Sequence, residues 1–380
     1  KLNEICEVYS GYALKAFNDA EDGFPVIKIG NIFMDGTLNL EECQYTTDGV
    51  NEKYYSQRGD IYIALSGATT GKIGIMDASE KYVINQRVGI VRQKSDDIPQ
   101  EYIKYFLLRQ TDRILQEAAG CAQPNISPRQ IAEYVVPDTS QEKMQEICEV
   151  LDRIKKIIDS RKVQISALDN LIKARFVEMF GDPVANEKGW TTKPLLDMGK
   201  CKNGMNFHYD DKGIEINCLG VGDFKNLSII DNTEELPTIL LNEMPSEEYL
   251  LKDDDIVFVR SNGNKALVGR SLAVYPGDVP TTFSGFCIRY RKHDNEITVP
   301  YLLRVLKTDS MRMKMAGRGA NIQNLNQQIL GTLVIPVPPV ELQNQFAAFV
   351  TEVNKSKVKV QKALDETQKL FDSLMQQYFG

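Results

Sequence analysis

Side chains able to contact the edges of nucleic-acid bases gather in two polar loops that follow short apolar runs. The first loop follows residues 61–65 and carries hydroxyl groups and a cation, on Ser66, Thr69, Thr70 and Lys72. The second follows residues 256–259 and carries guanidinium, hydroxyl, amide and ammonium groups, on Arg260, Ser261, Asn262, Asn264 and Lys265. Arginine pairs with the edge of guanine and asparagine with the edge of adenine. Both loops are therefore candidates for sequence-dependent contacts with DNA.

Further polar residues have the same chemical character. They fall in three other segments, as Asn85, Gln86 and Arg87, as Gln123, and as Arg318, Asn321 and Gln323. Scattered basic residues such as Lys28, Lys225 and Arg270 are candidates for phosphate contacts. Glycine, asparagine and serine are also common in solvated turns, so a purely structural role is the alternative for any single residue.

No group of residues predicts a catalytic site, a metal site or a cofactor bound to this chain. Residues 67–73 resemble a phosphate-binding loop, but the segment is too short and lacks a hydroxyl residue after Lys72. Asp210 and Lys212 have a spacing found in nucleases, although such triplets are common by chance. The chain has 2 histidines and 7 scattered cysteines without a C-x-x-C pair, which argues against zinc and disulfides.

Composition indicates an ordinary folded protein of two or three domains. Of its 380 residues, 42% are hydrophobic and 26% are charged, which is enough apolar material for buried cores. The net charge of −7 excludes a chain that is basic throughout, although DNA binding requires only a local basic patch. The scattered cysteines without a disulfide framework favour a reducing cytoplasm. No apolar run reaches the roughly 18 residues of a membrane span, so we expect no membrane contact.

Two long helices with the same apolar pattern must position these loops. Between residues 141 and 181 the apolar positions alternate in steps of four and three, at Ile147, Leu151, Ile154, Ile158, Ile165, Leu168, Ile172 and Met179. The pattern recurs near the end of the chain, at Phe346, Val350, Val353, Val360, Leu364, Phe371, Leu374 and Tyr378. This heptad spacing, sustained over about five heptads, predicts a coiled coil.

Polar residues interrupt the two heptad seams at different layers. Arg161 and Arg175 interrupt the first seam, whereas Lys357 interrupts the second at a layer that Ile158 occupies in the first. Two helices whose seams differ in this complementary way should pair with each other inside one chain. An antiparallel pair of helices of about 40 residues would be near 60 Å long.

Residues 1–139 form a first globular part, globule 1, that mixes short strands with a helix. We predict strands at Phe24–Ile29, Ile61–Leu65, Ile73–Ile75, Val88–Val91 and Tyr134–Val136, and a helix from Gln100 to about Ala119. Thr139 and Glu142 form a capping box that predicts the start of the first long helix, and Gly181 predicts its end.

Residues 184–339, globule 2, repeat this plan loosely. Ser10-Gly11 matches Asn203-Gly204, and Tyr102-Ile103 matches Tyr301-Leu302. The chain therefore divides into globule 1 (1–139), a helix (140–183), globule 2 (184–339) and a helix (340–380). We predict an α+β protein with two similar globules joined by an intramolecular antiparallel coiled coil, so that one chain imitates a symmetric dimer.

Several short segments occur twice, in the same order, and together they resemble a known family. They are residues 123–127, the strand ends Val136-Pro137 and Ile335-Pro336, the polar loops after 61–65 and 256–259, and Met179-Phe180-Gly181-Asp182-Pro183, whose Phe-Gly pair recurs as Phe379-Gly380. Through these segments and their order, the whole chain resembles the specificity subunit of a type I restriction–modification system.

The resemblance implies a division of labour between subunits. Each globule would be a target-recognition domain that recognises one half of a bipartite double-stranded DNA site, and the helices would set the spacer. Partner methyltransferase (M) subunits would bind S-adenosylmethionine, and a restriction/translocase (R) subunit would cut. This chain would be non-catalytic. Two alternatives stay open: the specificity component of a type IIB-like system, and a protein scaffold that does not bind DNA.

Overall fold

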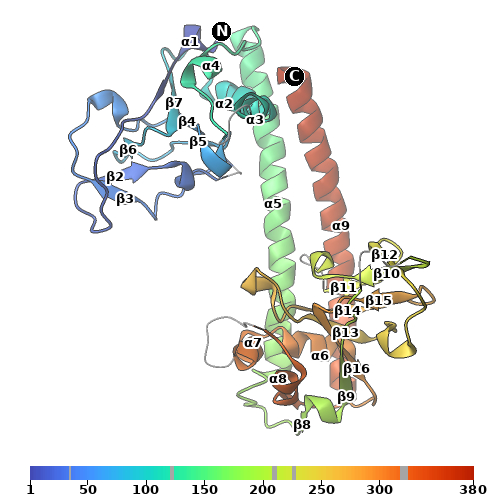
Figure 1. The fold of residues 1–380 in the computed structure, drawn as a ribbon. Helices are drawn as coiled ribbons and strands as arrows, with labels where there is room; N and C mark the ends of the chain where they lie inside the picture. The colour runs from blue at the N-terminus through green and yellow to red at the C-terminus, as the bar shows by residue number, and fades with distance from the viewer. Residues whose placement is uncertain (34–35, 120–123, 208–211, 225–227, 317–323) are drawn as a thin grey trace. The chain divides into compact units, whose positions relative to one another are not determined.

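The computed structural model describes residues 1–33, 36–119, 124–207, 212–224, 228–316 and 324–380. Two compact units form the chain, and both mix helices with sheets, which confirms the predicted α+β class (Figure 1). Unit 1 comprises Lys1–Val163 and Gln361–Gly380, and unit 2 comprises Gln164–Val360. The units cut across the predicted division of the chain because each long helix contributes to both of them.

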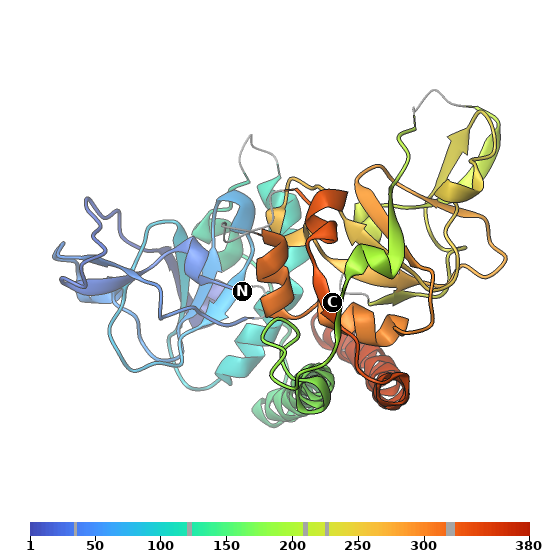
Figure 2. The same cartoon turned by 90° about the horizontal axis from the view of Figure 1, so that it is seen from below.

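The two long helices, α5 (Gln141–Phe180) and α9 (Val340–Phe379), have the predicted extent. In unit 1 the start of α5 packs with the end of α9, and in unit 2 the end of α5 packs with the start of α9, so the pair is antiparallel. The rings of Phe176 and Phe346, for example, lie 5.6 Å apart where α5 ends beside the start of α9 (Figure 2). Every residue of the two predicted seams is buried or partly buried.

Polar residues of the seams find partners across the helix pair. In unit 1, Arg161 donates to the carbonyl of Ala363 and to the hydroxyl of Thr367. In unit 2, the Lys357 ammonium donates to both carboxylate oxygens of Asp169, at 2.7 and 2.9 Å. Polar layers of this kind fix the register of a coiled coil at some expense of stability.

Among its described residues, unit 1 contains two sheets and four short helices. The larger sheet is antiparallel, in the order β1 (Cys6–Ser10), β7 (Val88–Gln93), β4 (Ile61–Ala64) and β5 (Ile73–Ile75). The smaller sheet has the order β3 (Gln44–Thr46), β2 (Phe24–Ile27) and β6 (Val83–Ile84). The helices are α1 (Leu2–Ile5), α2 (Gln100–Arg109), α3 (Thr111–Ala118) and α4 (Pro128–Ala132), and single 3-10 turns are η1 (Ile29–Asn31), η2 (Glu52–Tyr54) and η3 (Gly67–Thr69).

Unit 2 repeats this arrangement with additions. Its main sheet has the order β11 (Ile229–Ile230), β14 (Ser271–Val274), β13 (Asp255–Val259), β16 (Cys287–Lys292) and β9 (Gly199–Asn203). Two smaller sheets have the orders β12 (Thr238–Leu241), β10 (Ile214–Leu219), β15 (Thr281–Phe283), and β17 (Val334–Pro336), β8 (Thr192–Pro194). The helices are α6 (Val299–Leu306), α7 (Asp309–Ala316) and α8 (Gln327–Gly331), and the 3-10 turns are η4 (Leu195–Asp197), η5 (Val221–Asp223), η6 (Glu247–Tyr249) and η7 (Lys265–Leu267).

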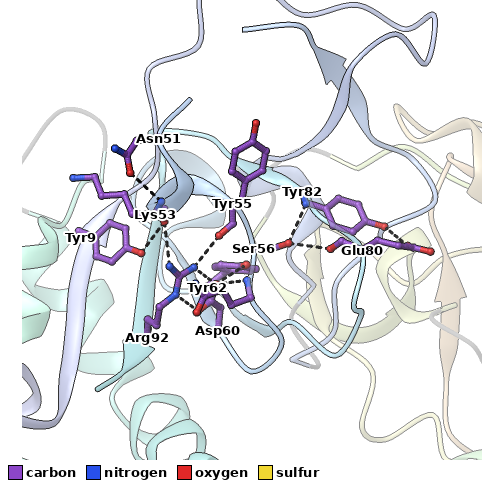
Figure 3. Close-up of polar contacts among 11 residues, drawn as sticks. Tyr9, Asn51, Lys53, Tyr55, Ser56, Asp60, Tyr62, Glu80, Tyr82 and Arg92 are labelled. Atoms are coloured by element: carbon purple, nitrogen blue, oxygen red, sulfur yellow. Dashed lines mark hydrogen bonds and ion pairs between the residues drawn. The ribbon is translucent and has the colours of Figure 1, made fainter. Parts of the chain in front are cut away.

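A buried ion pair braces the central strands of each unit. In unit 1, Arg92 of β7 donates two hydrogen bonds to Asp60, at 2.7 and 2.6 Å, and a third to the carbonyl of Tyr55 (Figure 3). Arg291 and Asp255 form the same fork in unit 2, at 2.7 Å for both bonds. A bidentate pair of this kind tolerates burial, and here it ties one strand to the start of the strand beside it.

Each long helix ends against a different globule: α5 ends against globule 2, and α9 ends against globule 1. Phe180, at the end of α5, packs edge-on against Tyr301 with ring centres 4.7 Å apart, and Phe379 packs in the same way on Tyr102 at 4.9 Å. The two tyrosine hydroxyls donate to the carbonyls of Pro336 and Pro137, at 3.0 and 3.1 Å. The predicted match between Tyr102 and Tyr301 therefore corresponds to the same local packing.

Three local predictions are wrong. The helix predicted from Gln100 to Ala119 is two helices, because the chain turns at Gln110, whose N–H contacts the carbonyls of both Phe106 and Leu107. Residues 134–136 do not form a strand, since the Tyr134 carbonyl accepts a bond from Leu2 instead of pairing in a sheet.

The third correction concerns the start of α5. Ser140, not Thr139, caps this helix, since its hydroxyl accepts from the N–H of Lys143 at 3.3 Å. The carboxylate of Glu142 lies in the first turn, where hydrogen bonds from the backbone and from Ser140 lower its pKa. The cap therefore lies one residue further along the chain than predicted, and it is not a capping box, because the residue three positions after Ser140 is Lys143.

Candidate nucleic-acid interface

The loop after β4 in globule 1 is a tight turn stabilised from within. Gly67 and Gly71 have positive φ values of 81° and 83°, which L-residues rarely adopt. Thr70 is buried, and its hydroxyl lies 2.7 Å from the carbonyl of Gly67 and 3.3 Å from that of Pro124. Thr70 therefore holds the loop in shape. Ser66 and Lys72 stay partly exposed, whereas the hydroxyl oxygen of Thr69 is buried.

Backbone hydrogen bonds bring three of the predicted polar segments of globule 1 together. The N–H of Leu65 donates to the carbonyl of Arg87 at 2.9 Å, and the N–H of Ile126 donates to the carbonyl of Leu65 at 2.9 Å. Ser66 also forms a bridge with Asn125. Gln86 and Arg87 are exposed, and Asn85 is partly exposed, so their side chains lie beside the loop and face outward.

Globule 2 contains the same three-way junction. The N–H of Arg260 donates to the carbonyl of Phe286 at 2.8 Å, and the N–H of Leu325 donates to the carbonyl of Arg260 at 2.8 Å. Arg260 also donates through Nη1 to the carbonyl of Gly285 at 3.3 Å, and its side chain is partly buried. The junction therefore presents the predicted loop 260–265 beside the turn that contains Phe286.

Two asparagines shape the loop in globule 2. The side-chain oxygen of Asn262 accepts from the N–H of Asn264 at 2.8 Å, and that of Asn264 accepts from the N–H of Ala266 at 3.1 Å. These bonds use the carbonyl end of each amide and leave its NH₂ end for a partner. Ser261 is partly buried and Lys265 is exposed.

Several candidate residues lie outside the part of the chain that the structure describes. They are Gln123, Lys225, Arg318, Asn321 and Gln323. Their contribution to DNA contact therefore stays a prediction from the sequence.

Basic side chains of unit 2 gather between globule 2 and the long helices. Burial, reinforced by the charges of Arg304 and Lys357, lowers the pKa of Lys307 to about 8. Burial and the nearby charge of Arg270 also lower the pKa of Arg312. The phosphate candidate Arg270 thus belongs to a local positive region in a chain of negative net charge.

The described residues contain neither a metal-binding cluster nor a thiol with a lowered pKa. They contain no group of three or more histidine, cysteine or acidic residues that could hold a metal ion. The described cysteines are free thiols, and burial raises the pKa of Cys6, Cys148, Cys201 and Cys218 to about 12, which disfavours the reactive thiolate. No helix among these residues is long and apolar enough to cross a membrane.

Sequence reasoning missed Phe286. Its side chain is 62% exposed, and in globule 2 it occupies the position that Arg87 has in globule 1. The repeat itself was a usable signal, since the interval that relates Phe180 to Phe379 also relates Arg87 to Phe286.

Comparison with known proteins places the chain in a family. The model of the type I restriction modification DNA specificity domain matches residues 1–169 and again residues 187–367. The chain belongs to this family. The sequence-based assignment to the specificity subunits of type I restriction–modification systems is thereby confirmed, and nothing found favours the type IIB-like or scaffold alternatives.

Two individual relatives of this specificity-family chain are distant in sequence, and each aligns with 96% of it. The StySPI specificity subunit of Salmonella potsdam is 24% identical over 96% of this chain and 84% of its own length. The putative MjaX specificity subunit of Methanocaldococcus jannaschii is 22% identical over 96% of this chain and 89% of its own length.

Two solved structures share the fold. The S subunit from M. genitalium aligns with 100% of this chain and 95% of its own, at 17% identity and a TM-score of 0.53. A chain from a structure concerning complex assembly and conformational transition of the type I R-M system aligns with 100% of this chain and 96% of its own, at 14% identity and a TM-score of 0.60. The predicted architecture of two globules and two long helices is therefore confirmed.

Proposed function

We propose that this specificity subunit binds double-stranded DNA through both globules, each of which recognises one half of a bipartite site. The observation that carries the proposal is the repeated three-way junction, at Leu65, Arg87 and Ile126 in globule 1 and at Arg260, Phe286 and Leu325 in globule 2. The same backbone arrangement presents different side chains in the two globules. A common framework with variable tips suits the recognition of two different half-sites.

Base contacts and phosphate contacts are divided between different residues in this proposal. Gln86, Arg87, Arg260, Asn262 and Asn264 would contact base edges, because their amide and guanidinium groups match adenine and guanine. Lysines at the loops and the positive region around Arg270 would contact phosphates and fix the register on the duplex.

The long helices would carry the partner subunits. Several apolar side chains outside the seam are exposed on both helices, including Leu171 of α5 at 48% and Leu370 of α9 at 51%. These two positions correspond in the repeat, so they would suit two copies of one partner. We infer that the partners are methyltransferase subunits that bind S-adenosylmethionine and flip an adenine out of the duplex. A restriction/translocase subunit would join them, and this chain would remain non-catalytic.

A domain exchange tests the proposal. Residues 184–339 are replaced by the corresponding part of a relative with a different recognition sequence, and methylated adenines are mapped in cells that carry the partner subunits. We expect one half of the site to change and the other half to persist. A change in both halves, or no sequence-specific methylation with either globule, would contradict independent recognition by the two globules.

A further inference from the structure

The turn that carries Phe286 is rigid, and the ring at its tip is exposed. Ser284 and Cys287 on either side are buried, whereas the Phe286 side chain is 62% exposed. The Ser284 hydroxyl accepts from the N–H of Phe286 at 3.3 Å, and the N–H of Cys287 donates to the Ser284 carbonyl at 2.8 Å. An exposed aromatic ring is common on protein surfaces, but this one stands at the tip of a hydrogen-bonded turn in the junction, where it is available for contact with a partner.

The equivalent turn of globule 1 has the same backbone bonds with a different tip. The Asn85 side chain accepts from the N–H of Arg87 at 3.2 Å, and the N–H of Val88 donates to the Asn85 carbonyl at 2.9 Å. The residues before the two tips also match. The backbone N–H of Gln86 donates to the carbonyl of Tyr12 at 2.9 Å, and the N–H of its counterpart Gly285 donates to the carbonyl of Met205 at 2.8 Å. The two turns therefore share one backbone arrangement, which carries a guanidinium group at its tip in globule 1 and a phenyl ring in globule 2.

A phenyl ring and a guanidinium select different groups in the major groove of DNA. Arginine donates two hydrogen bonds to guanine, whereas the apolar group that a base pair presents there is the 5-methyl group of thymine. Phenylalanine can also act as a wedge between bases, but wedges of this kind enter the minor groove and kink the duplex. In the junction, the N–H groups of Arg260 and Ser261 donate to the carbonyl of Phe286. The loop that these two residues begin also carries Asn262 and Asn264, whose amide groups match the major groove.

We propose that Phe286 is a specificity-determining residue that contacts the 5-methyl group of a thymine in the half-site recognised by globule 2. The inference rests on the proposed function, because it requires that this junction face DNA. It adds the chemical class of the recognised group and distinguishes the two globules: Arg87 at the same position would select a hydrogen-bonding base edge.

Replacement of thymine by deoxyuridine tests the contact directly, because it removes the methyl group and leaves base pairing intact. The complex of this chain with its methyltransferase subunits is titrated with duplexes in which each thymine of the second half-site is replaced in turn. We expect one replacement to weaken binding about fourfold, the value for one buried methyl group. In the Phe286→Ala complex the same replacement should have no effect, whereas Phe286→Leu should retain part of the penalty.

Arg87→Ala provides the matched control in globule 1. It should leave the deoxyuridine penalty of the second half-site unchanged while weakening binding to the first half-site. The proposal is overturned if no thymine replacement weakens binding, or if the penalty persists in Phe286→Ala. It is also overturned if Phe286→Ala abolishes DNA bending or subunit assembly without altering the penalty. Absence of any sequence-specific binding by the natural complex would instead refute the proposed function itself.

Discussion

Lys307 shows how a single charged residue can oppose the stability of its own unit. It follows α6 and donates to the hydroxyl of Ser228 at 2.8 Å. Burial is the main reason why its pKa falls from 10.5 to about 8, and the charges of Arg304 and Lys357 lower it further. Asp169 acts in the opposite direction, but it already accepts two hydrogen bonds from Lys357. The ammonium group at position 307 is therefore destabilising at neutral pH.

We expect Lys307→Met to raise the free energy of unfolding by about 1–2 kcal/mol at pH 7, because it removes a partly buried charge at the loss of one hydrogen bond. Between pH 8 and 10.5 the unfolded lysine keeps its proton while the folded one loses it, so the natural chain becomes more stable as the pH rises. The advantage of the variant should shrink across this window. Urea unfolding of both proteins at pH 7 and pH 10 measures this stability difference.

The exposed Lys314→Met is the control for that experiment, since it removes a lysine of the same unit from solvent-exposed surface. It should change the free energy of unfolding by less than about 0.5 kcal/mol. An advantage of Lys307→Met that stays constant between the two pH values would show that the charge at position 307 is not the cause.

Prediction of single residues from the sequence succeeded where local geometry decides. Gly11 and Gly204 matched in the repeat, and in the structure a Cβ at either would collide with a backbone carbonyl, of Ile84 or of Ser284. Thr70 illustrates the limit. A hydroxyl in a polar loop has the same sequence character whether it faces solvent or the carbonyls of its own loop, and only the fold shows that it is buried.

At the scale of elements, the start of α5 offers a direct test of the capping geometry. Ser140→Ala removes the hydroxyl that accepts from Lys143 and should lower the free energy of unfolding by about 1 kcal/mol. Thr139→Ala, which changes the residue that the sequence pattern favoured, should have a smaller effect. Thermal unfolding of both variants compares them, and a larger loss from Thr139→Ala would contradict the described cap.

Long periodic elements were predictable, and short ones were not. The heptad pattern extends over two helices of 40 residues, so a chance match is improbable and the bounds were correct within a residue or two. Residues 134–136 have the composition of a strand, but their backbone meets Leu2 in the fold. Their counterparts in the repeat, residues 333–335, largely lie in β17 (Val334–Pro336), because β8 provides a pairing partner. Strand formation depends on such a partner, which the local sequence does not specify.

At the scale of the whole molecule, the repeat contained more information than the individual loops. It predicted two similar globules, an antiparallel helix pair and corresponding recognition loops. It did not predict which segments meet, because backbone bonds such as those of Leu65 with Arg87 and Ile126 join positions far apart in the sequence. Once the junction is known, the repeat assigns Phe286 to the site, although its residue type had not suggested a polar contact.

The helix pair leads to a prediction about the distance between half-sites. Each helix passes from one unit to the other, between Val163 and Gln164 in α5 and between Val360 and Gln361 in α9. Inserting one heptad at both places keeps the seams in phase, since seven residues are almost two full turns. Both polar layers, Arg161 with Thr367 and Lys357 with Asp169, are preserved because each lies within one unit. The double insertion should therefore fold.

The insertion adds about 10.5 Å of helix between the units, equivalent to about three base pairs at 3.4 Å each. We expect a library of sites with randomised spacers to yield the original half-sites with a spacer longer by about three base pairs. Affinity should be lower, because three base pairs also rotate one half-site by roughly 100° around the duplex while the helices turn little. A heptad inserted in α5 alone is the control: it prevents the two polar layers from forming together and should destabilise the helix pair. Selection of the original spacer by the double insertion, at full affinity, would show that the helices do not set the distance.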